Sequence, residues 1–105
     1  MILTTTNNIE GKVISKYLGI VTGITYTPIY GGKGMTFKDM FSTAKYYESY
    51  EKGLEEAKEK AFQKLKSNGE KLKANAIVGI SVDVESIANS TASMISVTGT
   101  AVVII

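Results

Sequence analysis

The chain has 105 residues, 44% of them hydrophobic, and a formal net charge of +2 from 12 basic and 10 acidic residues. This length builds one domain, residues 1–105, around a single modest core, and so balanced a charge argues against nucleic acid as a partner. Cysteine, histidine and arginine are absent, which excludes disulfides, thiolate and imidazole chemistry, soft-metal sites and the arginine fork.

A membrane location is not expected. No segment approaches the ~20 consecutive apolar residues of a membrane span, and residues 1–8 lack the basic start of a secretory signal. We therefore expect a cytoplasmic protein without membrane contact.

The first quarter of the chain predicts two strands. Residues Ile2–Thr5 are compatible with a short strand, and Lys12–Thr25 is rich in β-branched and aromatic residues, which predicts a long one. Gly19 and Gly23 interrupt the long strand where a bend or bulge costs least. Residues 26–34 contain the single proline and a glycine cluster, which predicts a loop.

Two helices are expected next. Thr36 with Asp39 resembles a capping box and starts a short amphipathic helix. The main helix is expected from Tyr46 to Leu72 and to continue through Asn68 and Gly69 despite a cost of ~1 kcal/mol for the glycine. Its charged residues, including Lys60, are interpreted as a solvated face. Its apolar residues share another face: Tyr47, Tyr50, Leu54, Ala57, Ala61, Leu65 and Leu72.

Two runs of period-two hydrophobicity predict an antiparallel hairpin, Asn75–Glu85 with Met94–Ile105. In the first run one side of the strand is expected to carry Ala76, Val78, Ile80, Val82 and Val84. The predicted fold class is α+β, with an antiparallel sheet of three to four strands packed on the long helix plus the short helix.

The last strand also predicts self-association. Residues Ala101–Ile105 are apolar on both faces and carry no charge, so one face would be an aggregation-prone surface in a monomer. A neighbouring subunit would cover it. The alternative is a monomer in which the helix covers one face and the first strand the other.

Two kinds of site are candidates. Asp83 and Glu85 lie two residues apart on one side of a strand and could share a hard metal ion with ligands from elsewhere. Flat amphipathic rings could line a small-ligand pocket at a subunit interface, and the candidates are Tyr17, Tyr26, Tyr30 and Tyr46. No catalytic motif is present, so the residues do not favour an enzyme and indicate no catalytic residue.

Several short segments form a recognisable set: Thr4-Thr5, Glu10-Gly11, Ile20–Gly23, Tyr50–Lys52, Ala74–Ile80 and Val97–Val102. Together they resemble the YbjQ-like family of small bacterial and archaeal proteins. The resemblance covers nearly the whole chain and implies a dodecin-subunit-like fold assembled into homopentameric rings that pair into decamers. Members are labelled as heavy-metal-binding, although no activity is established for the family.

The chain departs from the family pattern at two places. A glycine-glycine-arginine-serine segment is common before the long helix, where this chain has Ala44–Ser49, and the position of Ser81 is often charged. We therefore expect a homo-oligomeric binding or assembly module, most simply a pentameric ring, with a ligand or partner site at subunit interfaces. The alternative is a protein that binds a metal ion through carboxylate ligands.

Overall fold

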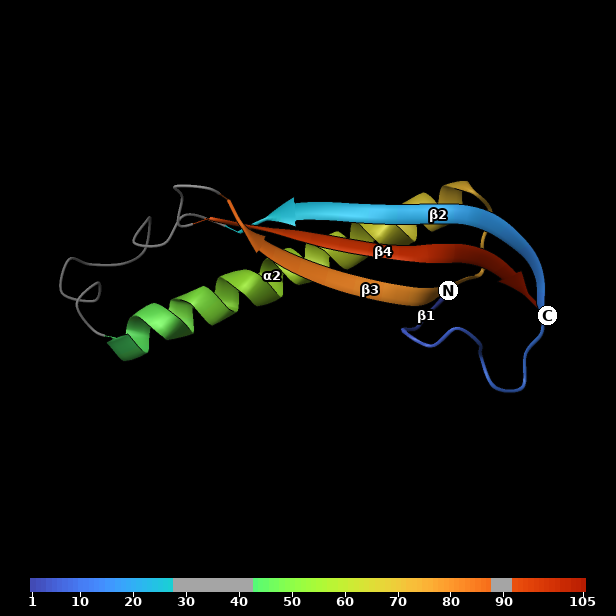
Figure 1. Cartoon of the computed structure of the whole chain (residues 1–105), viewed down its shortest axis with the longest axis horizontal. Helices are drawn as coiled ribbons and strands as arrows, with labels where there is room; N and C mark the ends of the chain where they lie inside the picture. Colours follow the sequence, from blue (N-terminus) through green and yellow to red (C-terminus); the bar gives the residue numbers. More distant parts are fainter. Residues whose placement is uncertain (28–42, 88–91) are drawn as a thin grey trace.

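The structure, a computed structural model, describes residues 1–27, 43–87 and 92–105, with only the backbone described for residues 43–47. These residues form one long helix packed on one face of a four-stranded sheet (Figure 1). The elements are β1 (Ile2–Leu3), β2 (Ile14–Tyr26), α2 (Thr43–Lys71), β3 (Ala76–Ser86) and β4 (Ser93–Ile104). The predicted α+β class and the strand positions are confirmed. The predicted short helix from Thr36 falls almost entirely on residues outside these ranges.

The sheet is mixed, with strand order β1-β3-β4-β2. The predicted hairpin is confirmed, because β3 and β4 pair antiparallel, and β4 also pairs antiparallel with β2. The expectation of a purely antiparallel sheet is wrong at β1, which pairs parallel with β3. The chain forms β2 and α2 after β1 and before β3. Strand β3 then runs beside β1 in the same direction. The Ile2 amide donates to the Asn75 carbonyl and the Thr4 amide to that of Ile77.

Helix α2 lies behind the sheet in the view of Figure 1 and presents small residues to it. Ala57, Ala61 and Leu65 are buried and belong to the main core, as the helical spacing predicted. The predicted continuation through Gly69 is also confirmed. Leu72 is 41% exposed, so the prediction that it lies on the inner face of the helix was wrong. The helix ends one residue earlier, at Lys71, and the chain then turns away from the helical path.

The apolar side chains of β3 are divided between the two faces of the sheet, which corrects the expected single face. Ile77 and Ile80 pack in the core under α2, whereas Ala76 and Val78 join a second cluster on the opposite face. A register shift between Val78 and Ser81 inserts one extra residue relative to β4. Gly79 lies in this bulge at φ 61°, a conformation that glycine adopts without strain. After the bulge, the even-numbered residues of β3 face α2 instead of the opposite side of the sheet. A strict period of two cannot predict this change.

The core therefore has a main part and a minor part. The main part lies between α2 and the sheet and consists of Val21, Ala57, Ala61, Leu65, Ile77, Ile80, Ile95, Val97 and Ala101. The minor part, on the other face, consists of Ala76, Val78, Val102 and Ile104, with Ile9 and Ile14 packed against it. Among the described residues, only one end of that outer face is thus covered by the chain itself. Within the ranges described above, no helix is long and apolar enough to cross a membrane.

Candidate functional site

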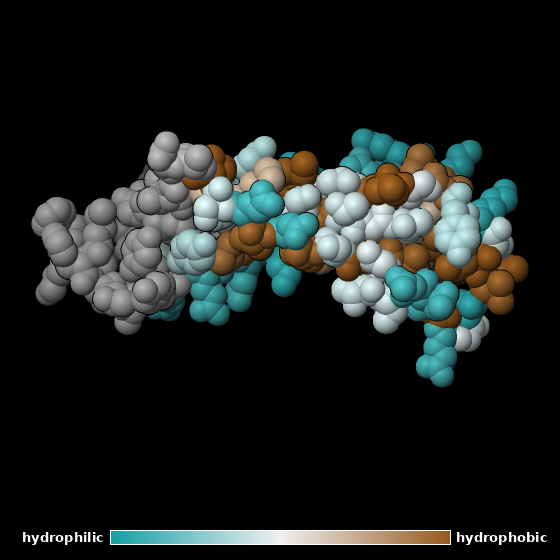
Figure 2. All heavy atoms as spheres, in the orientation of Figure 1, coloured by the Kyte–Doolittle hydropathy of each residue, from teal (hydrophilic) through white to brown (hydrophobic). Residues whose placement is uncertain are grey.

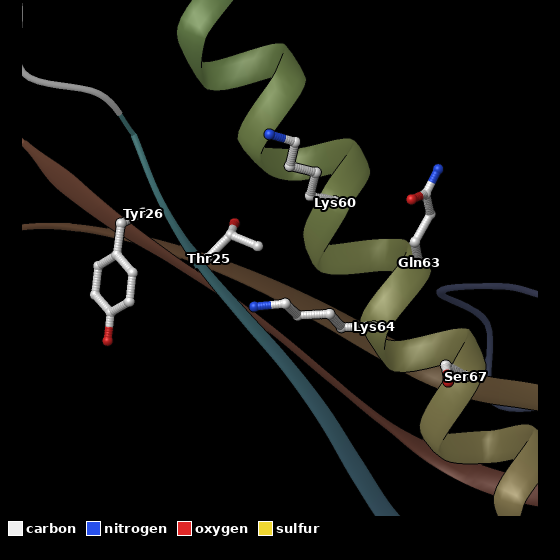
Figure 3. Close-up of a pocket in the computed structure, with 6 residues that line it drawn as sticks. All are labelled: Thr25, Tyr26, Lys60, Gln63, Lys64 and Ser67. Atoms are coloured by element: carbon white, nitrogen blue, oxygen red, sulfur yellow. The ribbon is translucent and has the colours of Figure 1, made fainter.

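A groove runs along the side of β2 that pairs with no other described strand, between β2 and α2. It consists of two adjoining hollows of about 480 and 430 Å³ that share Lys64 and Ser67. Figure 3 shows the residues of the first hollow: Lys60, Gln63, Lys64 and Ser67 belong to the helix, and Thr25 and Tyr26 to the strand. Lys64 extends toward Thr25, whereas the Tyr26 ring is turned away from the helix. The second hollow is lined by Thr22, Gly23, Ile24, Lys64, Ser67, Asn68 and Lys71.

Two helix side chains cover the exposed backbone of β2. The Lys64 Nζ donates to the Ile24 carbonyl at 2.8 Å, and the Asn68 Nδ2 donates to the Thr22 carbonyl at 2.8 Å. Both carbonyls belong to the edge strand of the sheet, and an unpaired edge is a template for association with another strand. Their satisfaction by side chains makes main-chain pairing at this part of β2 unfavourable.

The strand and the helix approach each other closely next to the groove. The Thr25 Oγ1 is buried and donates to the Ala57 carbonyl of α2 at 2.6 Å. Ala61 lies opposite Gly23, whose missing side chain leaves room for the helix backbone. This contact fixes the distance between the two walls, so the groove is a feature of the backbone packing.

The groove is positively charged. Its lining contains Lys60, Lys64 and Lys71, and none of the lining residues described is acidic. An ammonium group has three donors, and Lys64 spends one of them on the Ile24 carbonyl. The two hollows can therefore attract a carboxylate or another anionic group, and an adjoining hollow places Glu56 and Glu59 beside Lys60.

The face of the sheet that turns away from α2 carries large exposed apolar side chains. On β2, Tyr17 is 72% exposed, Ile20 77% and Tyr26 62%, and Ile24 is also exposed. They pair across to Val102, Thr100, Met94 and Ser96 of β4, whose side chains alternate with the buried Ile95, Val97 and Ala101. Figure 2 shows this face, with brown apolar groups lying between white and teal polar ones.

The structure does not gather the four candidate tyrosines. Tyr17 and Tyr26 share the outer face, but their partners Val102 and Met94 are eight residues apart on β4, which is roughly 27 Å along a strand. Tyr26 lines the groove and Tyr17 does not. Tyr30 and the side chain of Tyr46 lie outside what the structure describes. A pocket built from all four tyrosines is therefore not shown, and of the two whose side chains are described Tyr26 lies at a hollow.

The predicted metal-binding pair lies where the sequence placed it. Asp83 and Glu85 are exposed on the outer face of β3, opposite Ser96 and Met94 of β4. Ser81 is beside them on the same face, opposite Thr98. Over the described residues, no group of three or more acidic, histidine or cysteine side chains converges on one point. The pair would need ligands from another molecule to hold an ion.

Sequence reasoning missed the groove because its lysines were interpreted as a solvated face. Lys60, Lys64 and Asn68 follow one another at intervals of four and therefore lie on one side of the helix. Gly23 in β2 and the small residue Ala61 in α2 were the available signals that a strand would lie close to the helix. Only the packing shows which strand that is.

Comparison with known proteins identifies relatives of the whole chain. A family model described as "Putative heavy-metal-binding" matches residues 1–105. A crystal structure of a protein of unknown function from Pediococcus pentosaceus ATCC 25745, which belongs to the DUF74 family, superposes with a TM-score of 0.58. The alignment covers 100% of this chain and 98% of that chain at 18% sequence identity. At this identity the likeness is one of fold.

Proposed function

This chain belongs to the YbjQ family, and from that premise we propose that it forms a homo-oligomeric ring, most simply a pentamer, that binds a ligand or partner where subunits meet. The observation that carries the proposal is the outer face of the sheet. Tyr17, Ile20 and Tyr26 are each more than half exposed there, and burying such large apolar side chains against another copy would be favourable.

Two strand edges support the same proposal. β2 forms one edge of the sheet, and β1 covers the other edge only as far as Ile77 of β3. Backbone bonds from Gly79 and Ile80 to Thr6 and Thr4 extend this cover slightly. Within the described residues, Ser81–Ser86 of β3 therefore pairs on one side only. Open edges and an exposed apolar face are what repeated contacts between copies would bury.

The groove beside β2 supports a binding role for the assembled protein. Each of its hollows has the volume of a small-molecule pocket, which is roughly 300–1,000 Å³, and Tyr26 lies at the edge of the first. A neighbouring subunit would supply the missing wall. The lysine-rich lining suits a polar group that carries negative charge, whether it belongs to a ligand or to the neighbouring subunit.

Native mass spectrometry of the purified protein tests this proposal. The expected result is a closed multiple of the 11.3 kDa chain, with additional mass if a ligand is retained. Ile20→Lys should dissociate the assembly, because it places a charge on a buried interface. Asn8→Lys adds the same charge on an exposed loop and should leave the assembly intact. A wild-type monomer at micromolar concentration would contradict the proposal.

The alternative is that the ring binds a hard metal ion through Asp83 and Glu85. Its support is the description of the family together with the common face of the two carboxylates. Oxygen ligands suit magnesium or calcium, and the absence of cysteine and histidine from the sequence leaves no thiolate or imidazole ligand for a heavy metal. Calorimetric titration of the wild type and of Asp83→Asn with Glu85→Gln tests it. Equal heats for the two proteins would remove this alternative.

A further inference from the structure

We propose that the acidic edge of β3, which pairs on one side only among the described residues, docks in one copy of this chain onto the lysine groove of the next copy. The acidic edge consists of Ser81–Ser86 with the carboxylates of Asp83 and Glu85, and the lysine groove contains Lys60 and Lys64. This inference rests on the proposed ring and names the two surfaces that close it. The partner is therefore a second copy of the same chain.

The two surfaces lie on opposite edges of one sheet. β2 forms one edge together with the groove, and the second half of β3 forms the other, with β4 between them (Figure 1). A contact between two different surfaces of identical chains is heterologous, and it generates a closed ring when the rotation between copies divides a full turn. Surfaces on opposite edges suit such a contact because each copy then has one neighbour on each side.

The charges of the two surfaces lie at the same levels along the strands. Cross-strand pairing places Asp83 in one row with Ser96 and Ile24, and it places Glu85 in a second row with Met94 and Tyr26. Lys64 binds the Ile24 carbonyl and so belongs to the first row. Lys60 is one helical turn away and lines the same hollow as Tyr26, so we assign it to the second row.

Rotation preserves these levels. In a ring whose axis runs along the strands, every copy keeps its residues at the same height, so Asp83 of one copy faces Lys64 of the next and Glu85 faces Lys60. The spacings also agree. Four residues of helix separate the lysines by ~6 Å, and two residues of strand separate the carboxylates by ~7 Å.

The groove is prepared for side chains and not for a further strand. The Thr22 and Ile24 carbonyls, which an added strand would need, already accept hydrogen bonds from Asn68 and Lys64. Carboxylates can use the remaining donors of the lysines. The β3 edge of each copy thus contacts the lysine groove of the next copy, all around the ring. The charge pairs in each contact fix the register and orientation of neighbouring copies.

Charge reversal at one level provides the test. Lys60→Glu or Glu85→Lys alone places like charges in contact, and each should weaken assembly by about tenfold or more, measured as the protein concentration at which the ring dissociates. The double variant restores opposite charges with their order exchanged and should assemble as the wild type does. Lys64 is left unchanged because it also covers the edge of β2.

Two matched variants control for net charge. Lys58→Glu and Glu70→Lys change exposed residues of α2 outside the groove, and neither should alter the dissociation concentration. Circular dichroism melting of every variant separates loss of folding from loss of assembly. Added sodium chloride should weaken the wild-type ring, because it screens exposed charge pairs.

The outcomes distinguish this inference from the proposed function. A wild-type ring that survives both single reversals would overturn the docking of the β3 edge on the groove and leave the ring itself standing. The docking is overturned as well if both single variants dissociate and the double variant stays folded but does not reassemble. A wild-type protein that is monomeric would overturn the ring, and the docking with it.

Discussion

Gly23 of β2 lies against the backbone of Ala61 in α2. A Cβ atom on Gly23 would overlap the Ala61 carbonyl oxygen and come within 2.8 Å of the Leu65 amide nitrogen. Both obstacles are backbone atoms of a helix, which cannot rotate away as a side chain can. The contact therefore sets how closely the helix approaches the sheet.

Gly23→Ala should destabilise the fold by about 1–3 kcal/mol, the usual cost of overpacking a core. Chemical denaturation monitored by circular dichroism measures the change. Ser96→Ala, on the outer face of β4, is the control and should cost less than about 0.5 kcal/mol. A Gly23→Ala protein as stable as the wild type would show that α2 packs on β2 less tightly than described.

Thr25→Val should destabilise the protein by about 1 kcal/mol, because it removes a buried hydrogen bond while keeping the shape of the side chain. The Thr25 Oγ1 donates to the Ala57 carbonyl at 2.6 Å. Thr22→Val makes the same change at an outward-facing position of the same strand, opposite Thr98, and serves as the matched control. Equal midpoints of denaturation for the two variants would argue against a contribution from the Thr25 bond.

Gly69→Ala should fail to deliver the gain of ~1 kcal/mol expected from helix propensity alone. Its new methyl group would approach the Ile77 Cδ1 at 2.8 Å, and Ile77 is fully buried. Ile77→Val removes that atom. In a double-mutant cycle Gly69→Ala should therefore be more favourable in the Ile77→Val background, by about 1 kcal/mol. Additive changes in the free energy of unfolding would contradict the contact.

Asn75→Asp should cost about 1–2 kcal/mol through the loss of a donor. The Asn75 side chain acts like a peptide group toward β4. Its Nδ2 donates to the Ile104 carbonyl at 2.9 Å, and its Oδ1 accepts from the Ile104 amide at 2.7 Å. An aspartate keeps the second bond and sets a carboxylate against the carbonyl. Asn8→Asp, on the exposed N-terminal loop, controls for the added charge, and a thermal melt compares the two.

The hydrophobic pattern predicted much of the fold. The two long strands of the hairpin, the strand that begins near Ile14 and the long helix through Gly69 are all where local periodicity placed them. These features depend on neighbours in sequence, which the sequence displays directly. The ring, its ligand and the cytoplasmic location stay predictions.

The site was less predictable because it combines residues from distant segments. Tyr26 and Lys64 are 38 positions apart and meet only when α2 packs on β2. The acidic residues of β3 gained significance only when strand pairing placed Asp83 in the same row as Ile24. No local pattern carries such information.

The sequence by itself determined the class of the fold and the side-chain chemistries that the chain lacks, since composition and periodicity are properties of the unfolded chain as much as of the folded one. Tertiary structure decided the rest. The parallel place of β1, the reversal of faces at the Gly79 bulge and the lysine groove all depend on which backbone atoms meet. Close packing between helix and sheet makes that choice, because only small residues such as Gly23 and Ala61 permit it.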